Sequence, residues 1–157
     1  MKRHVSLQPL SRDHYGGLVQ AKHLTEAADK GPDERAAAVA GFARAWETEI
    51  SDHFAVEERL LLPLLGDEAA EAARLREEHG ALRALAAQAA VPSVEPNTLR
   101  TLGRRLHDHI RWEERELFPL LERTLSEAQL AALEEPLQEA ENRRPRAAHP
   151  RLGKKTT

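Results

Sequence analysis

Two stretches of the chain are near copies of one segment: HFAVEERLLLPLL at residues 53–65 and HIRWEERELFPLL at residues 109–121. They align without gaps, and eight of the 13 positions are identical. Chance does not readily produce such agreement in a chain of 157 residues. The repeat therefore predicts two helical hairpins of one plan, each carrying one copy of the motif H-x-x-x-E-E.

The histidine and the first glutamate of each copy are four residues apart, so in a helix they lie on one face, one turn apart. Both pairs, His53 with Glu57 and His109 with Glu113, interrupt an apolar stripe. The stripe residues at helical spacing are Phe42, Trp46, Ile50, Leu60 and Leu64 in the first copy and Leu99, Leu102, Leu106, Leu117 and Leu120 in the second. We therefore expect both pairs to face the core.

Two further histidines follow the same pattern. His14 lies between Leu10 and Leu18, and His79 lies between Leu75 and Leu82. Each is preceded by an acid, in Asp13-His14 and Glu78-His79. The sequence thus places a histidine on the buried face of four helical blocks.

Buried carboxylates are costly unless a cation compensates them, and neutral imidazoles are not cations. Metal ions would supply the charge while the imidazoles supply nitrogen ligands. Four histidines and two glutamates exceed the needs of one tetrahedral zinc and suit a dinuclear site with bridging carboxylates. Nitrogen and oxygen donors without thiolate favour iron or manganese, with zinc as an alternative. A lone core histidine is more often a packed residue, but the duplicated His–Glu pair favours the metal site. The candidate ligands are His14, His53, Glu57, His79, His109 and Glu113.

The composition favours helices. The chain has 26 Ala and 23 Leu against 15 Val, Ile and Thr together, and the first two are strong helix formers. Helix breakers divide it into blocks at about 11–28, 33–65, 68–90 and 98–124, with a short fifth at 126–142. Short connections predict an all-α, antiparallel up-down-up-down four-helix bundle. We expect one domain, 1–142, followed by a disordered basic tail, 143–157.

The composition also excludes several classes. The chain has no cysteine, which excludes disulfides, zinc–thiolate sites, iron–sulfur clusters and thiol nucleophiles, and favours a reducing, cytoplasmic compartment. The first residues carry no signal-peptide pattern, and no stretch is long and apolar enough for a membrane span. The net charge of −3 gives no general support for nucleic-acid binding. The tail carries six Lys or Arg and no acid, and we interpret it as solvated rather than bound to an acidic partner.

These motifs resemble the hemerythrin-like family, also called the HHE cation-binding domain, over about residues 8–125. The resemblance rests on both H-x-x-x-E-E copies with the leucines and proline that follow them, on Leu10-Ser11-Arg12-Asp13-His14 and on Glu78-His79. It implies a non-haem di-iron centre. In such a centre the four histidines are terminal ligands, Glu57 and Glu113 bridge the irons, and an oxo or hydroxo group is the third bridge. Ferritin-like di-iron bundles are disfavoured, because no histidine here has Glu three residues before it.

Oxygen carriers of this family have a fifth histidine one turn along the third helix. Here the corresponding positions are Leu75 and Arg83. One iron then has an additional open position, unless water or a nearby Glu fills it, and O2, peroxide or NO can bind there. We therefore expect a protein that binds O2 or a related small ligand. A peroxide- or NO-consuming enzyme and an iron- or oxygen-sensing module are the alternatives.

Residues around the candidate site have less specific interpretations. Glu58 and Glu114 are either supplementary metal ligands, hydrogen-bond acceptors for histidine N–H groups, or members of surface ion pairs with Arg59 and Arg115; we favour the ion pairs. Tyr15 either gates the pocket or fills an interhelical gap. The remaining residues are expected to take no part in metal binding: His4, His23, His107 and His149 as non-ligands, Trp46 and Trp112 as packing residues, and Pro63 and Pro119 as helix kinks or ends.

Overall fold

The computed structural model describes residues 2–91 and 94–145, and every regular element within these ranges is helical. The α-helices are α1 (Gln8–Ala27), α2 (Pro32–Ala45), α3 (Ser51–Leu60), α4 (Leu62–Leu65), α5 (Ala70–Ala89), α6 (Pro96–Trp112), α7 (Phe118–Thr124) and α8 (Glu127–Arg143). Three short segments complete the set: the 3-10 turn η1 (Val5–Leu7) and the π-helices η2 (Trp46–Ile50) and η3 (Glu113–Leu117). The all-α prediction is confirmed. In the described ranges, no helix is long and apolar enough to cross a bilayer.

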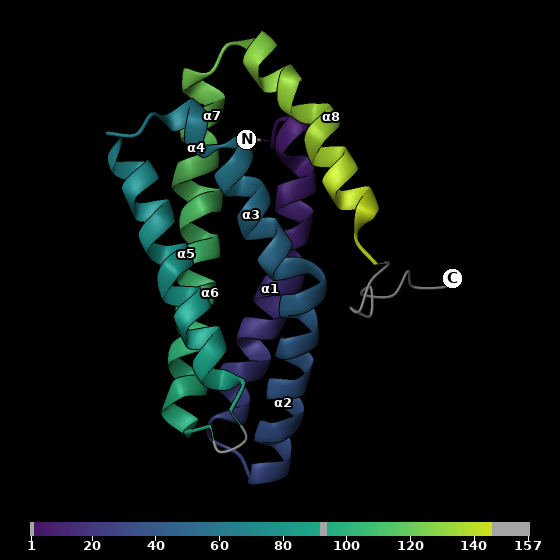
Figure 1. The fold of residues 1–157 in the computed structure, drawn as a ribbon, viewed down its shortest axis with the longest axis vertical. Helices are drawn as coiled ribbons and strands as arrows, with labels where there is room; N and C mark the ends of the chain where they lie inside the picture. Colours follow the sequence, from purple (N-terminus) through teal and green to yellow (C-terminus); the bar gives the residue numbers. More distant parts are fainter. Residues whose placement is uncertain (1, 92–93, 146–157) are drawn as a thin grey trace.

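The helices form a bundle (Figure 1). Segments α2, η2 and α3 follow one another without a loop, as do α6, η3 and α7. Helix α1 packs against α6 and α2, and α5 packs against α6. Helix α8 begins with a capping box, in which Ser126 and Gln129 exchange hydrogen bonds. It runs along the outside of the bundle and contacts η1, α1 and α3.

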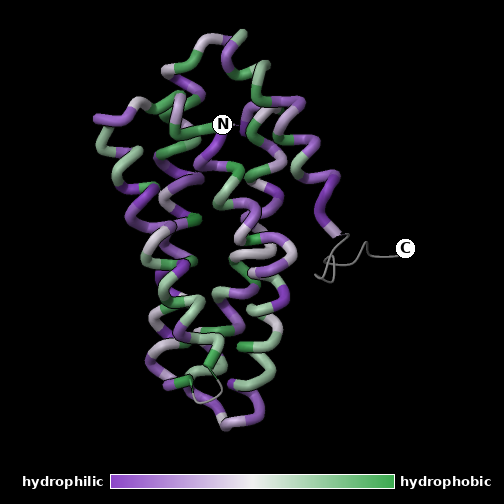
Figure 2. Tube along the Cα trace, in the orientation of Figure 1, coloured by the Kyte–Doolittle hydropathy of each residue, from purple (hydrophilic) through white to green (hydrophobic). Residues whose placement is uncertain are grey.

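The bundle interior has two apolar clusters with a polar layer between them. One cluster contains Leu24, Phe42 and Leu106, and the other contains Leu10, Leu75 and Leu117. The candidate ligands lie where each helix passes from one cluster to the other; His79, for example, lies between Leu75 and Leu82. Figure 2 shows hydrophilic and hydrophobic residues alternating along the helices, as in amphipathic helices. Apolar burial on both sides therefore holds the polar layer in place.

The helical register departs from the predicted stripe after each repeated His–Glu pair. Leu61 and Leu121 are fully buried, whereas Leu60, Leu64 and Leu120 are half-buried. In the second copy the π-helix η3 inserts one extra residue into the turn and rotates the helical residues after it. In the first, α3 ends at Leu60 just before Pro63, as expected for a residue without a backbone donor.

The end of the last helix differs from the expected boundary. Helix α8 extends to Arg143, and the side chain of Arg144 is only 7% exposed. Arg144 pairs with Asp13 of α1 and Asp52 of α3. The first two residues of the predicted basic tail thus belong to the bundle, and residues 146–157 of that tail lie outside the described residues.

The close approach of α1 and α6 depends on Gly103. A Cβ atom there would lie 2.7 Å from the backbone oxygen of Ala21 and 2.6 Å from Cγ2 of Thr25. We predict that Gly103→Ala destabilises the fold by about 1–3 kcal/mol, because the backbone must move. Gly80→Ala is the matched control: nothing lies within 4 Å of its Cβ, so it should stabilise helix α5 by about 0.5–1 kcal/mol. Urea unfolding measures both; equal effects would contradict the packing interpretation.

Candidate metal centre

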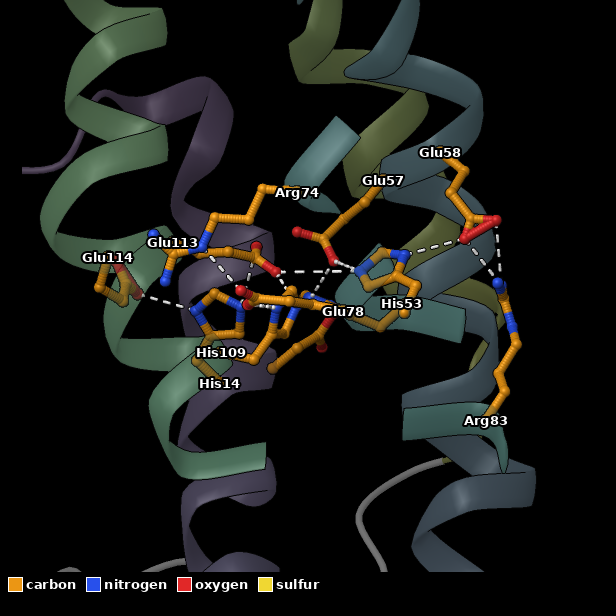
Figure 3. Close-up of polar contacts among 12 residues, drawn as sticks. His14, His53, Glu57, Glu58, Arg74, Glu78, Arg83, His109, Glu113 and Glu114 are labelled. Atoms are coloured by element: carbon orange, nitrogen blue, oxygen red, sulfur yellow. Dashed lines mark hydrogen bonds and ion pairs between the residues drawn. The ribbon is translucent and has the colours of Figure 1, made fainter. Parts of the chain in front are cut away.

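The six predicted ligands converge in the polar layer. Figure 3 labels five of them: His14, His53, Glu57, His109 and Glu113. Glu57, His79 and Glu113 are fully buried, and the side chains of His14, His53 and His109 are at most 5% exposed. They come from α1, α3, α5, α6 and η3, whereas α2 and α8 supply none of them. The prediction that these residues face one interior is therefore met by the geometry.

Each histidine directs its Nε2 atom at a glutamate. The Nε2 atoms of His53 and His79 lie 3.1 and 3.3 Å from Oε1 of Glu57. Nε2 of His14 lies 3.5 Å from Oε2 of Glu113, and Nε2 of His109 contacts Oε1 of the same carboxylate. These are ion-pair distances, and both glutamates lie at the centre of the histidine set.

The opposite ring atoms face outward, and each Nδ1 meets a carboxylate from another helical segment. The pairs are His14 with Glu114 at 3.1 Å, and His53 with Asp13, His79 with Glu58 and His109 with Glu78, each at 2.8 Å. A carboxylate accepts, so Nδ1 carries the proton and donates it. In the neutral ring, Nε2 is then left with a free lone pair directed at the centre.

The inner atoms form a donor set without a partner. None of the four Nε2 atoms and none of the four oxygens of Glu57 and Glu113 has a hydrogen-bond partner. Lone pairs of imidazoles thus face carboxylate oxygens in a buried space, an arrangement that is unfavourable unless cations lie between them. The donors therefore fit metal ions.

The donors divide into two groups that share both glutamates. One contains His14 and His53, the other His79 and His109, and each includes Glu57 and Glu113. Within each group one ligand atom per residue lies within 4.8 Å of all the others. We call these groups the His14 position and the His79 position. Each offers two imidazole nitrogens and two shared carboxylates, with no sulfur.

The outer carboxylates follow a regular order. Each is the sequence neighbour of one ligand and accepts a hydrogen bond from a ligand on another segment. Asp13 of α1 accepts from His53 of α3, and Glu58 of α3 accepts from His79 of α5. Glu78 of α5 accepts from His109 of α6, and Glu114 of η3 accepts from His14 of α1. The four contacts close a ring around the bundle, which we call the carboxylate ring. Glu58 and Glu114 do form ion pairs, but with Arg83 and Arg3 rather than with Arg59 and Arg115. They also accept hydrogen bonds from His79 and His14, which was the alternative interpretation.

The carboxylate ring is ionised. Burial raises the pKa of the Glu78 carboxyl, but hydrogen bonds from His109 and Arg74 outweigh burial and hold the pKa below its usual range. The same balance lowers the pKa of Asp13, Glu58 and Glu114, each beside a histidine and an arginine. Four negative charges thus surround the histidines and strengthen them as ligands.

Protons compete with metal for the same histidines. Without a metal ion, burial lowers the pKa of His109, but the charge of Glu113 outweighs burial and raises the pKa to about 10. His14 and His53 shift in the same direction, because Glu113, Glu114, Glu57 and Asp13 face them. Metal binding must displace these protons, since a coordinating nitrogen needs its lone pair.

A sequence model of the hemerythrin HHE cation binding domain matches residues 10–121. The chain belongs to this hemerythrin HHE family. No curated protein and no solved structure matches it. The matched range contains all six candidate ligands and the whole carboxylate ring, so the family's cation-binding character agrees with the donor geometry.

This hemerythrin-like chain has no fifth histidine in the third helical block. Leu75 is fully buried in an apolar cluster. Arg83 is exposed, and its guanidinium donates to Glu58 at 2.8 Å. Neither side chain replaces the absent imidazole, so the two positions are provided with the same types of ligand.

The other aromatic residues and histidines lie around the centre or away from it. The ring of His79 stacks on Phe54 at 4.0 Å, and Trp46 meets the edge of Phe54 at 5.6 Å. Trp112 is buried, as expected for a packing residue, whereas Tyr15 is 42% exposed and does not fill a gap. Three histidines lie outside the donor groups, namely His4, which contacts Ser6 and Glu127, and the exposed His23 and His107. His149 lies outside the described residues.

Removing one carboxylate of the ring should weaken metal binding without unfolding the bundle. We predict that Glu78→Ala lowers metal affinity by about 10–100-fold, because His109 loses the acceptor that fixes its ring. The matched control is Glu77→Ala, one residue away and exposed, which should keep the affinity of the unaltered protein. Competition with a chromophoric chelator measures both, and equal affinities in the two variants would show that the ring does not orient the ligands.

Proposed function

We propose that this protein holds two iron ions at the His14 and His79 positions and binds a small oxygen- or nitrogen-containing ligand there. The observation that carries the proposal is the pair of donor groups that share both glutamates. Nitrogen and oxygen donors without thiolate favour iron or manganese, and zinc is an alternative. Glu57 and Glu113 would be shared by both ions, which would account for two buried carboxylates at the centre of the bundle.

The ions would supply Lewis acidity and redox chemistry toward a ligand in an open coordination position. The chain's own contribution is to hold four donors at each position, to keep Nδ1 of each histidine protonated, and to exclude bulk water. With no fifth histidine, the protein leaves room at both positions for a further ligand. This supports binding of O2, peroxide or NO over a closed structural metal site.

A small cavity beside the centre limits the size of that ligand. Its volume is about 20 Å³, which is space for roughly one water-sized molecule. Its lining consists of His14, His53 and His109 with Gly17, Ile50, Phe54, Leu106 and Ile110, together with Asp13 and Glu49. Mostly apolar walls and this volume favour a diatomic molecule or peroxide over an organic substrate.

Several broader expectations belong to the same proposal. We propose that the long segments run up-down-up-down as an antiparallel four-helix bundle, and that residues 1–142 form the metal-binding domain. The basic tail and a reducing, cytoplasmic compartment remain predictions from the composition. The alternative is an iron- or oxygen-sensing role. In that role the protein converts no substrate, and ion occupancy changes its folded state instead.

Metal loading tests the proposal. Protein produced with iron should hold two ions per chain, and air oxidation of the iron(II) form should give an oxo-bridged iron absorption. We predict that Glu57→Ala and His109→Ala lose this absorption and at least half of the iron, because both remove inner donors. His107→Ala alters an exposed histidine two residues away and should retain both. A protein without stoichiometric metal, or a His107→Ala variant that loses metal like His109→Ala, would contradict the proposal.

Turnover separates a ligand-binding protein from an enzyme. The absence of a fifth histidine favours steady consumption of peroxide or NO at the open positions. If the enzyme interpretation holds, the iron-loaded protein consumes either compound over many cycles, and His109→Ala abolishes this while His107→Ala does not. If the protein binds the ligand to saturation but does not consume it, the result supports the ligand-binding function and contradicts the enzyme interpretation.

A further inference from the structure

Each member of the carboxylate ring is paired on its outer side with an arginine. Arg83 donates to Glu58 at 2.8 Å and Arg74 to Glu78 at 2.7 Å. Arg3 donates to Glu114 at 2.9 Å, and Arg144 donates to Asp13. Each of the four histidines therefore donates to a carboxylate, and that carboxylate in turn accepts from an arginine.

The four arginines come from two different kinds of place in the fold. Arg74 and Arg83 both lie on α5, and their side chains are 49% and 41% exposed. Arg3 precedes the first helix and Arg144 follows the last one; their side chains are 20% and 7% exposed. Two supports thus come from a helix interior and two from segments outside the regular helices.

This division coincides with the two ion positions. Arg3 acts through Glu114 on His14, and Arg144 acts through Asp13 on His53. Both histidines of the His14 position therefore depend on the terminal segments. Arg83 through Glu58, and Arg74 through Glu78, support His79 and His109 of the other position.

The terminal arginines also connect separate parts of the chain. Arg144 pairs with Asp52 at 3.0 Å as well as with Asp13, so it links the end of α8 to both α1 and α3. Arg3 donates to the backbone oxygen of Glu114 at 2.7 Å and pairs with Glu122 of α7. Detaching either segment removes a cation from a largely buried carboxylate, which costs more than breaking an exposed ion pair.

We propose that Arg3 and Arg144 are positioning residues that make the stability of the His14 position depend on docking of the two terminal segments. The His79 position is held from α5 and does not depend on them. Segments outside the regular helices detach more readily than helix interiors, so the ion at the His14 position is the one whose binding responds to undocking of the segments that carry Arg3 and Arg144. This inference rests on the proposed two-ion centre.

The test compares ion occupancy at each position in full-length protein. Crystals of variants loaded with limiting iron(II) without oxygen are measured by anomalous diffraction at the iron edge, which gives the two occupancies separately. Arg144→Ala and Arg3→Ala should lower occupancy at the His14 position, equivalent to about a 10–100-fold loss of affinity, and leave the His79 position near that of the unaltered protein. Arg144→Lys should restore part of the loss, because it returns the charge without the second donor.

Two controls separate this role from general docking of the terminal segments. Arg12→Ala breaks the 3.0 Å pair between Arg12 and Glu141, which also ties α8 to α1 but touches no ring carboxylate. It should leave both occupancies unchanged. Arg74→Ala should affect the His79 position instead.

The outcomes are distinct. Equal losses at both positions, no loss in Arg144→Ala and Arg3→Ala, or a loss in Arg12→Ala as large as in Arg144→Ala would overturn the inference. A single ion in the unaltered protein would instead refute the two-ion function on which it rests. If Arg144→Ala fails to fold by circular dichroism, Arg3→Ala tests the same position from the other end of the chain.

Discussion

Glu57 and Glu113 are the constraint on which the rest of the structure depends. Both carboxylates are fully buried, and none of their oxygens has a hydrogen-bond partner. Two unpaired negative charges in a protein interior are strongly unfavourable unless cations neutralise them. The four surrounding Nε2 atoms face the same place. Metal ions bound there would supply the positive charge that protons on the histidines supply without metal. The two apolar clusters on either side keep water out and hold the donors together.

Around that centre the polar groups form successive layers from inside to outside. The inner glutamates are followed by the imidazoles, then by the carboxylate ring, then by four arginines. Each layer fixes the orientation of the layer inside it through hydrogen bonds between different segments. Because the contacts between imidazoles and ring carboxylates cross from one segment to another, metal binding and packing of the bundle are coupled, as they are in other sites where ligation contributes to folding.

The helical fold and the set of six inner residues could both be predicted from the sequence, because both depend on helical spacing alone. The repeat marks Glu57 and Glu113, and apolar neighbours mark His14 and His79. Only part of the carboxylate ring could be predicted from the sequence. An acid next to a candidate ligand, as in Asp13-His14, is a signal, but the histidine that the acid contacts lies on another segment. Arg144 falls in the predicted tail because its contacts to Asp13 and Asp52 are separated from it by most of the chain. The π-helix at Glu113 gives no signal in the apolar pattern.

The central claim is that two iron ions share Glu57 and Glu113. X-ray absorption at the iron edge of the loaded protein in solution tests it most directly. Two ions that share both glutamates would show nitrogen and oxygen ligands only, outer scattering from imidazole rings, and an iron neighbour at about 3.5–4 Å or less. Isolated ions with no iron neighbour, at full loading, would contradict it.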